Sequence, residues 1–158
     1  MNPIEPIRAS ISVKAEPARA FELFTDVMGA WWPVERYSRA VDEYEGEDVK
    51  VERVEFQHWV GGHVLEHLSN GEVLPWAEIL VWQPPSRLVL AWKPNATENP
   101  PTEVEVRFSP DDVGTLVELE HRGWERLGGI AEQARSRYGA GWDFNLERFK
   151  EAAELDVA

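Results

Sequence analysis

The segment TEVEVRFSPDDVGTLVELEH, residues 102–121, decides the fold class of this chain. In each half of it apolar side chains alternate with charged ones, which is typical of a β-strand with one buried face and one face in water. The two halves, residues 102–108 and 115–121, are separated by a turn over residues 110–114. The segment therefore predicts two neighbouring antiparallel strands whose apolar faces point the same way.

Shorter alternating runs extend this pattern toward the N-terminus. Turn signals separate them: Gly61-Gly62, Pro84-Pro85, and Asn70-Gly71, which is the strongest hairpin signal in the chain. The further strands that we predict are residues 8–14, 49–56, 62–68, 74–82 and 88–92. Residues 95–101 are polar and contain prolines, and we expect a loop there.

Two helices flank the strands. Residues 17–26 have apolar side chains at helical spacing and begin with Pro17, whose fixed φ suits a first turn; Gly29 follows and is expected to end the helix. Residues 130–158 are predicted to be mostly helical. Their second half, which we expect Gly139 and Gly141 to introduce, carries one apolar stripe: Trp142, Leu146, Phe149 and Ala153.

A run of strands flanked by helices predicts an α+β fold. We expect a curved antiparallel sheet of about six to seven strands, wrapped around the long C-terminal helix, with short helices after the first strand. The 158 residues are enough for one domain, and we predict a single domain over residues 1–158 with its core between about residues 7 and 155. Where the helix and the sheet do not close completely, a pocket would remain.

Charge and composition exclude several classes of function. With 16 basic and 29 acidic residues the net charge is −13, which argues against nucleic acid and anionic membrane surfaces as partners. The absence of cysteine excludes disulfides, thiol catalysis and zinc–thiolate sites. We see no signal peptide and no apolar run near the roughly 20 residues that span a bilayer, so we expect a cytoplasmic protein without membrane insertion.

Eight tryptophans are several times the usual number, and they indicate either an unusually aromatic core or a pocket lined by indoles. We favour the pocket, and we interpret Trp59 and Trp124 as structural. The candidate ligand-binding residues are Trp31, Trp32, Trp76, Glu78, Trp82, Trp92, His121, Trp142 and Leu146.

Two of these residues are also candidates for acid–base chemistry. His121 is in phase with apolar neighbours at a strand end, so it is either a general base near neutral pH or a histidine that hydrogen-bonds a neighbour. Glu78 is in phase with Trp76 and Trp82; it is either a carboxylate whose pKa desolvation raises, or an exposed or paired glutamate at a sheet edge. We predict no confident catalytic residue.

Other polar groups give weaker signals. His63 and His67 share a strand face with side chains about 7 Å apart, too far for chelation without a third ligand, and with His58 nearby they do not make a convincing metal site. We therefore expect no metal and no cofactor. The acidic run Asp42, Glu43, Glu45, Glu47 and Asp48 is interpreted as a solvated loop, with a cationic partner as the alternative.

The order of these elements, with several motifs, resembles the SRPBCC or START-like superfamily and, within it, the AHSA family, homologues of the activator of heat-shock-protein ATPase. The stretches that carry the resemblance are ARAFELFTDVMGAWWP (18–33), GGHV with Glu66 (61–66), WAEI (76–79), WQPPSRL running to Trp92 (82–92), residues 102–108, TLVELEHRGW (115–124), and Gly141-Trp142 with Leu146 and Phe149. No single motif is decisive, but together they cover most of the chain.

The resemblance implies a helix-grip fold with a hydrophobic cavity between the sheet and the C-terminal helix. It also implies a pocket mouth near Trp31 and Trp32, so we expect one of these two residues to act as a gate. It implies little about chemistry, because this superfamily holds carriers, cyclases and stress-related proteins. We expect binding of a small hydrophobic or aromatic ligand, with two alternatives: a cyclase- or dehydratase-like enzyme using His121 and Glu78, or a regulatory or stress-related protein-interaction domain. The family's co-chaperones carry an additional N-terminal domain, so we expect no chaperone partner; a homodimer stays open.

Overall fold

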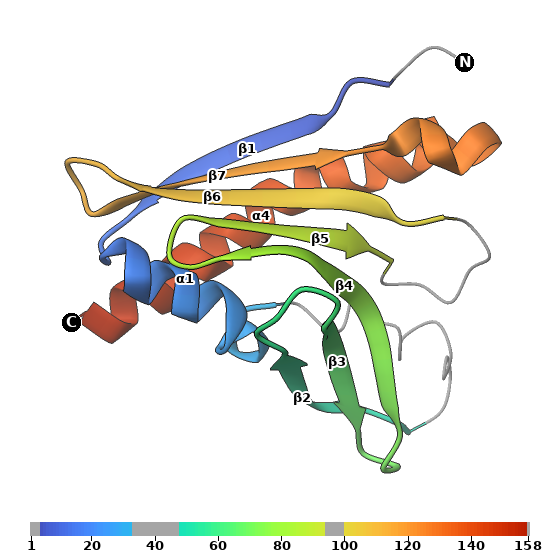
Figure 1. The fold of residues 1–158 in the computed structure, drawn as a ribbon, viewed down its shortest axis with the longest axis horizontal. Coiled ribbons are helices and arrows are strands. Elements are labelled where there is room, and N and C mark those ends of the chain that lie inside the picture. The colour runs from blue at the N-terminus through green and yellow to red at the C-terminus, as the bar shows by residue number, and fades with distance from the viewer. Residues whose placement is uncertain (1–3, 33–47, 94–99, 158) are drawn as a thin grey trace.

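Seven strands form one antiparallel sheet in the order β1-β7-β6-β5-β4-β3-β2 (Figure 1). The computed structural model describes residues 4–32, 48–93 and 100–157. The strands are β1 (Ile7–Val13), β2 (Val51–Phe56), β3 (His63–Leu68), β4 (Val73–Gln83), β5 (Arg87–Trp92), β6 (Thr102–Pro110) and β7 (Thr115–Arg122). Each predicted strand is present, and the ends differ by one or two residues.

The hairpin of β6 and β7 is the one that the alternating segment predicts. Its register pairs Val104 with His121 and Val106 with Leu119, so the apolar side chains of both strands are buried together. In the turn, the Asp111 carboxylate accepts hydrogen bonds from the backbone N–H groups of Val113 and Gly114. Alternation and turn chemistry agree here, which is why the sequence alone locates both strands.

Strand β4 departs from simple alternation at two places. Its pairing with β3 shifts between Val64 and Leu65, which leaves Trp76 as an extra residue, and its pairing with β5 shifts between Ile79 and Val81. A β-bulge of this kind reverses the side-chain phase beyond it. The predicted phase of Glu78 with Trp76 and Trp82 is therefore wrong: Glu78 is exposed while the residues on both sides of it are buried.

The helices are α1 (Pro17–Thr25), the 3₁₀-helices η1 (Met28–Ala30) and η2 (Trp124–Ile130), and α4 (Ala131–Val157). Gly29 does not end α1; it lies inside η1, and the helix ends one residue earlier than predicted. Similarly, α4 continues through Gly139 and Gly141. Glycine is a poor helix former, but burial of Tyr138 and Trp142 on either side outweighs that preference.

Helix α4 runs behind the sheet on the same side as α1, and this arrangement confirms the α+β helix-grip fold (Figure 1). We call the sheet face turned toward α4 the inner face and the opposite one the outer face. No helix among the described residues is long and apolar enough to cross a membrane. Most of the predicted loop over residues 95–101, and the acidic run apart from Asp48, lie outside the described residues.

Candidate functional site

Five tryptophans meet between the inner face and α4, and we call them the indole cluster. Each is at most 3 % exposed. The members are Trp31, Trp32, Trp76, Trp92 and Trp142. They come from the residues after η1, from β4, from β5 and from α4, so the fold brings together the rings that the sequence predicted as pocket walls and gate.

Trp32 is the ring that touches the most members of the indole cluster. It stacks on Trp76 with 5.7 Å between ring centroids and 15° between ring planes. Its edge meets Trp92 at 5.4 Å, and it is tilted against Trp142 at 5.8 Å. Offset-stacked and edge-to-face rings at these distances attract each other beyond the burial of their area. A planar aromatic group in place of the Trp32 ring would meet the same three partners.

Trp31 is held more firmly than a gate would be. Its indole Nε1 donates a hydrogen bond to the backbone carbonyl of Leu23, at 2.9 Å. Its own carbonyl accepts a hydrogen bond from Nε of Arg148 on α4, at 2.7 Å. Movement of Trp31 would break both hydrogen bonds and expose a buried donor. These two hydrogen bonds fix the position of Trp31, one of the two residues predicted as a gate.

His121 lies at the centre of a chain of neutral hydrogen bonds. The Trp142 indole N–H donates to Nδ1 of His121 at 3.0 Å, so the ring proton sits on Nε2. Nε2 in turn donates to Oγ1 of Thr102 at 2.7 Å, and the Thr102 hydroxyl donates to the carbonyl of Trp92 at 3.4 Å. Both ring nitrogens are thus used, and the tautomer is fixed.

Burial lowers the pKa of His121 from its ordinary value of 6.5 to about 3. The side chain is completely buried, so the imidazolium would lose its hydration, and neither of its ring-nitrogen partners is an anion. His121 is therefore neutral at physiological pH and serves as a hydrogen-bonding bridge between β7, β6 and α4. A general base needs a nitrogen that can reach a substrate proton, and here both nitrogens are occupied.

The remaining predicted site residues lie apart from the His121 chain. Trp82 is half-buried and packs against Phe21 of α1 and, stacked at 5.1 Å, against His58. Leu146 is buried in the apolar stripe of α4. Glu78 points to the outer face and is exposed, as one alternative predicted, but its strand β4 lies inside the sheet rather than at an edge. The structure thus unites six predicted residues: Trp31, Trp32, Trp76, Trp92, Trp142 and His121.

The two tryptophans interpreted as structural behave differently. Trp59 is 56 % exposed in the loop after β2. Trp124 is buried against His121 at 4.1 Å between ring centroids, and its indole donates to the His121 carbonyl. Among the residues that the structure describes, no group of three His, Asp or Glu side chains is placed to hold a metal ion.

Sequence reasoning missed three polar residues of the interior: Thr102, Glu66 and Asn145, all nearly or completely buried. Thr102 orients His121, as described above. Glu66 falls between Val64 and Leu68 on the buried face of β3, so strict alternation could have placed it. Asn145 lies three residues after Trp142 and four before Phe149, so the helical spacing of the apolar stripe contains the signal for it.

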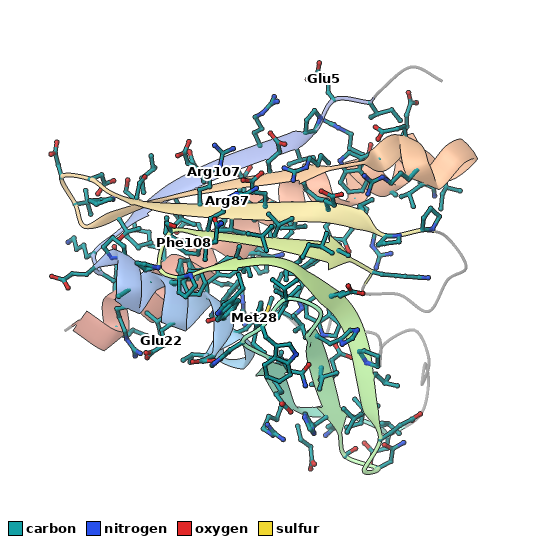
Figure 2. The ribbon with its side chains drawn as sticks, viewed as in Figure 1. Glu5, Glu22, Met28, Arg87, Arg107 and Phe108 are labelled. Carbon is teal, nitrogen blue, oxygen red and sulfur yellow. The ribbon has the colours of Figure 1, made fainter. Side chains whose placement is uncertain are left out.

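The outer face carries charges. The Glu105 carboxylate lies 2.7 Å from Arg87, 2.6 Å from Arg122 and 3.4 Å from Arg107. Burial alone would raise the pKa of Glu105, but hydrogen bonds from Arg87 and Arg122 outweigh it and hold that pKa below its ordinary value. Figure 2 marks Arg87 and Arg107 on the neighbouring strands β5 and β6. We call these four residues the Glu105 network.

One open groove, of about 500 Å³, lies away from the indole cluster along β1 and β7. It is lined mainly by charged and polar side chains, among them Arg8, Arg107, Glu118 and Glu120. Such a lining does not suit a hydrophobic ligand, because ligand pockets of that class are mostly apolar with a few placed polar groups. The groove therefore does not change the choice of the indole cluster as the candidate site.

Comparison with known proteins agrees with this fold. The model of the family described as "Activator of Hsp90 ATPase homolog 1-like protein" matches residues 14–154. A search of the curated proteins gives no significant match. The structure of protein MLL2253 from Mesorhizobium loti is similar with a TM-score of 0.68, at 18 % identity over 98 % of both chains.

Two further solved structures are informative. The AHSA1-like protein from Aeromonas hydrophila is 18 % identical, with a TM-score of 0.61 over 93 % of this chain and 90 % of its own. An anthrahydroquino-γ-pyrone synthase, Txn09, solved in complex with a compound designated SUM, is 26 % identical, with a TM-score of 0.58 over 94 % of this chain and 97 % of its own.

Proposed function

Because the chain belongs to the family of Activator of Hsp90 ATPase homolog 1-like proteins, we propose that it binds a small hydrophobic or aromatic molecule between the inner face and α4. The fold of this family commonly binds hydrophobic ligands. The observation that carries the proposal is the indole cluster, in which five buried aromatic side chains from four parts of the chain share one space.

The ligand takes the place of the Trp32 ring. Trp76, Trp92 and Trp142 then contact the ligand as they contact Trp32 here, so ring–ring attraction to the ligand replaces the attraction to Trp32. Trp31 stays in place through its two hydrogen bonds. The free energy of binding is then the difference between the interaction of the ligand with these three rings and the interaction of the Trp32 indole with them. This difference favours flat molecules with more ring area than indole.

The similarity to the synthase supports an aromatic ligand. Its printed name describes the formation of an anthrahydroquino-γ-pyrone, a polycyclic aromatic compound, and its sequence is 26 % identical to this one over nearly the whole chain. A ligand of several fused rings is larger than an indole and matches the class that replacement of Trp32 selects.

The same similarity favours an enzyme as the second candidate, and we predicted a cyclase- or dehydratase-like enzyme with His121 and Glu78 as acid and base. The positions of these two residues do not support that pairing. His121 is buried with both ring nitrogens engaged, whereas Glu78 is exposed on the outer face. An enzyme built on this chain would therefore use other residues for proton transfer.

Several expectations stay predictions alongside this proposal. We propose a cytoplasmic protein formed by one domain, with a small hydrophobic molecule as its partner and with no nucleic acid, membrane insertion or chaperone partner. A homodimer stays open. The net charge of −13 disfavours polyanionic partners and is compatible with an uncharged ligand in an interior where His121 is neutral.

Native and denaturing mass spectrometry of the freshly purified protein tests the proposal. We expect an extra mass under native conditions that disappears on denaturation, or, after incubation with 2-naphthol, the mass of that probe. A Trp59→Ala variant is the matched control, because Trp59 is exposed and lies outside the indole cluster. The proposal is wrong if the native mass equals the chain mass in both samples.

A further inference from the structure

Among the described residues, the buried side chains of Asn145 and Trp76 have polar groups without a hydrogen-bond partner. One is the side-chain amide of Asn145 on α4, where both Nδ2 and Oδ1 are unpaired and the residue is 0 % exposed. The other is the indole Nε1 of Trp76 on β4. Buried polar groups are nearly always paired, because an unpaired one keeps the full cost of its desolvation. Each of these groups therefore calls for a physical explanation.

Trp76 contacts Trp32 directly, and Asn145 lies on the turn of α4 that faces the same segment of the chain. The Trp76 ring stacks directly on the Trp32 ring. Asn145 shares the buried face of α4 with Trp142, which contacts the Trp32 ring, and with Phe149, which contacts the Trp31 ring at 5.3 Å. Arg148, three residues after Asn145, is bonded to the carbonyl of Trp31. This turn of α4 therefore faces the segment that carries Trp32.

We propose that the amide of Asn145 and the indole N–H of Trp76 bind polar substituents of the ligand, which is therefore a hydroxylated or carbonyl-bearing aromatic compound rather than a hydrocarbon. This inference rests on the proposed function, because it assigns the ligand class of the same site. The two groups come from β4 and from α4, so they fix the orientation of the ring between sheet and helix.

The chemistry of the two groups sets what the ligand carries. An indole N–H is a donor only, so it matches an acceptor oxygen such as a carbonyl or a phenol oxygen. A carboxamide both donates and accepts, so it matches a hydroxyl group, which does the same. A carboxylate is a poorer match, because His121 offers the site no positive charge and ionised groups are costly to bury unpaired.

The contrast with the other polar groups of the site supports this assignment. The indole N–H groups of Trp31, Trp92 and Trp142 donate to Leu23, Tyr138 and His121. The fold thus provides partners for these three members of the indole cluster and leaves Trp76 without one among the described residues. The unpaired Trp76 group lies beside the ring that the ligand replaces, and the turn of α4 that carries Asn145 faces the same segment.

The test compares 2-naphthol with naphthalene, which differ by one hydroxyl group. Dissociation constants are measured by titration of ¹⁵N-labelled protein, with the indole N–H signals as the readout and as a check of folding. The proteins are wild type, Asn145→Leu, Trp76→Phe and the control Trp59→Phe, which removes an indole N–H from an exposed ring. Trp76→Phe keeps an aromatic ring and removes only the donor and part of the stacking area.

We expect the affinity for 2-naphthol relative to naphthalene to fall about tenfold in Asn145→Leu and several-fold in Trp76→Phe, and to stay unchanged in Trp59→Phe. If both probes bind wild type but neither Asn145→Leu nor Trp76→Phe changes their ratio, the polar assignment is wrong and the two groups pair with buried water. If neither probe binds wild type, the proposed function itself is contradicted.

Discussion

The side chains on the inner face of the sheet interact through different chemistry from those on the outer face. On the inner face the rings of the indole cluster are buried, and the hydrogen bonds of Trp31, Trp92, Trp142 and His121 join neutral groups. On the outer face Glu105 is surrounded by three arginines that are partly in water. Ion pairs across β5, β6 and β7 tie the strands together independently of the rings. We therefore expect the outer face to keep the sheet in shape when a ligand replaces an indole on the inner face, as proposed above.

The two faces should differ most in the stability that is lost when one of their side chains is shortened to alanine. Trp92→Ala removes a buried ring that contacts Trp32, Trp76 and Trp142, and we expect a loss of about 3–5 kcal/mol in the free energy of unfolding. Arg107→Ala, on the exposed side of the Glu105 network, should change it by less than about 0.5–1 kcal/mol. Urea unfolding measures both, and similar losses for the two variants would contradict the comparison.

A smaller loss of stability is expected when the hydrogen bond between Trp142 and His121 is removed but an aromatic ring is kept. Trp142→Phe keeps an aromatic ring but leaves Nδ1 of His121 without its donor, which together with the lost ring area should cost about 2–3 kcal/mol. Trp59→Phe is the control, because that indole is exposed. Thermal unfolding of both variants tests this, and an unchanged stability of Trp142→Phe would show that the bond contributes little.

The buried histidine makes the inner face sensitive to acid. The pKa of His121 is about 3 in the folded protein and near 6.5 in the unfolded chain. The unfolded state therefore takes up a proton first, so this contribution to stability is complete above about pH 6.5 and falls as the pH drops toward 3. Between about pH 7 and about pH 5 we expect wild type to lose about 2 kcal/mol from this group.

The measurement is urea unfolding at both pH values for wild type and His121→Gln, which lacks the titrating ring but can still donate toward Thr102. The variant should show a flatter dependence of stability on pH, whatever its absolute stability. Glu105 does not interfere between about pH 7 and about pH 5. Because its pKa is lowered in the folded protein, its contribution to the stability of the protein is lost only as the pH falls below its ordinary value of 4.5. Equal pH dependences of the two proteins would contradict a neutral His121.

A small effect is also expected when the carboxylate of the outer face is neutralised. Glu105→Gln removes the carboxylate that pairs with Arg87, Arg107 and Arg122, and should cost about 1 kcal/mol because water and salt reach the partly exposed arginines. The difference between wild type and variant should shrink as salt is added. If the stability difference between wild type and Glu105→Gln does not change with salt, the Glu105 network is less accessible to solvent than its partly exposed arginines indicate.

The sequence was sufficient for the fold wherever one local rule applied. Alternation in the segment 102–121 and the Asn70-Gly71 turn located their strands, and helical spacing located the stripe of Trp142 and Phe149. Strand β4 could not be interpreted in this way, because its two β-bulges depend on pairing with β3 and β5. Glu78 was placed on the wrong face for that reason.

The candidate site shows the same division. Trp76, Trp92 and Trp142 were predicted because tryptophan is rare and each was in phase with apolar neighbours. Trp31 and Trp32 were predicted from the position of the pocket mouth that the family resemblance implies. The partners of His121 were not, because Thr102 and Trp142 meet it only after β6, β7 and α4 have packed. Whether the rings enclose a pocket or fill it depends on packing that spacing does not encode.

The most direct test of ligand binding at the indole cluster is a ¹H–¹⁵N correlation spectrum of wild-type protein during titration with 2-naphthol. Each of the eight tryptophans gives one indole signal, which Trp→Phe variants assign. We predict shifts at Trp32, Trp76, Trp92 and Trp142, with Trp59 and Trp124 nearly unchanged. Shifts confined to Trp59, or no shifts at saturating probe, would contradict the account.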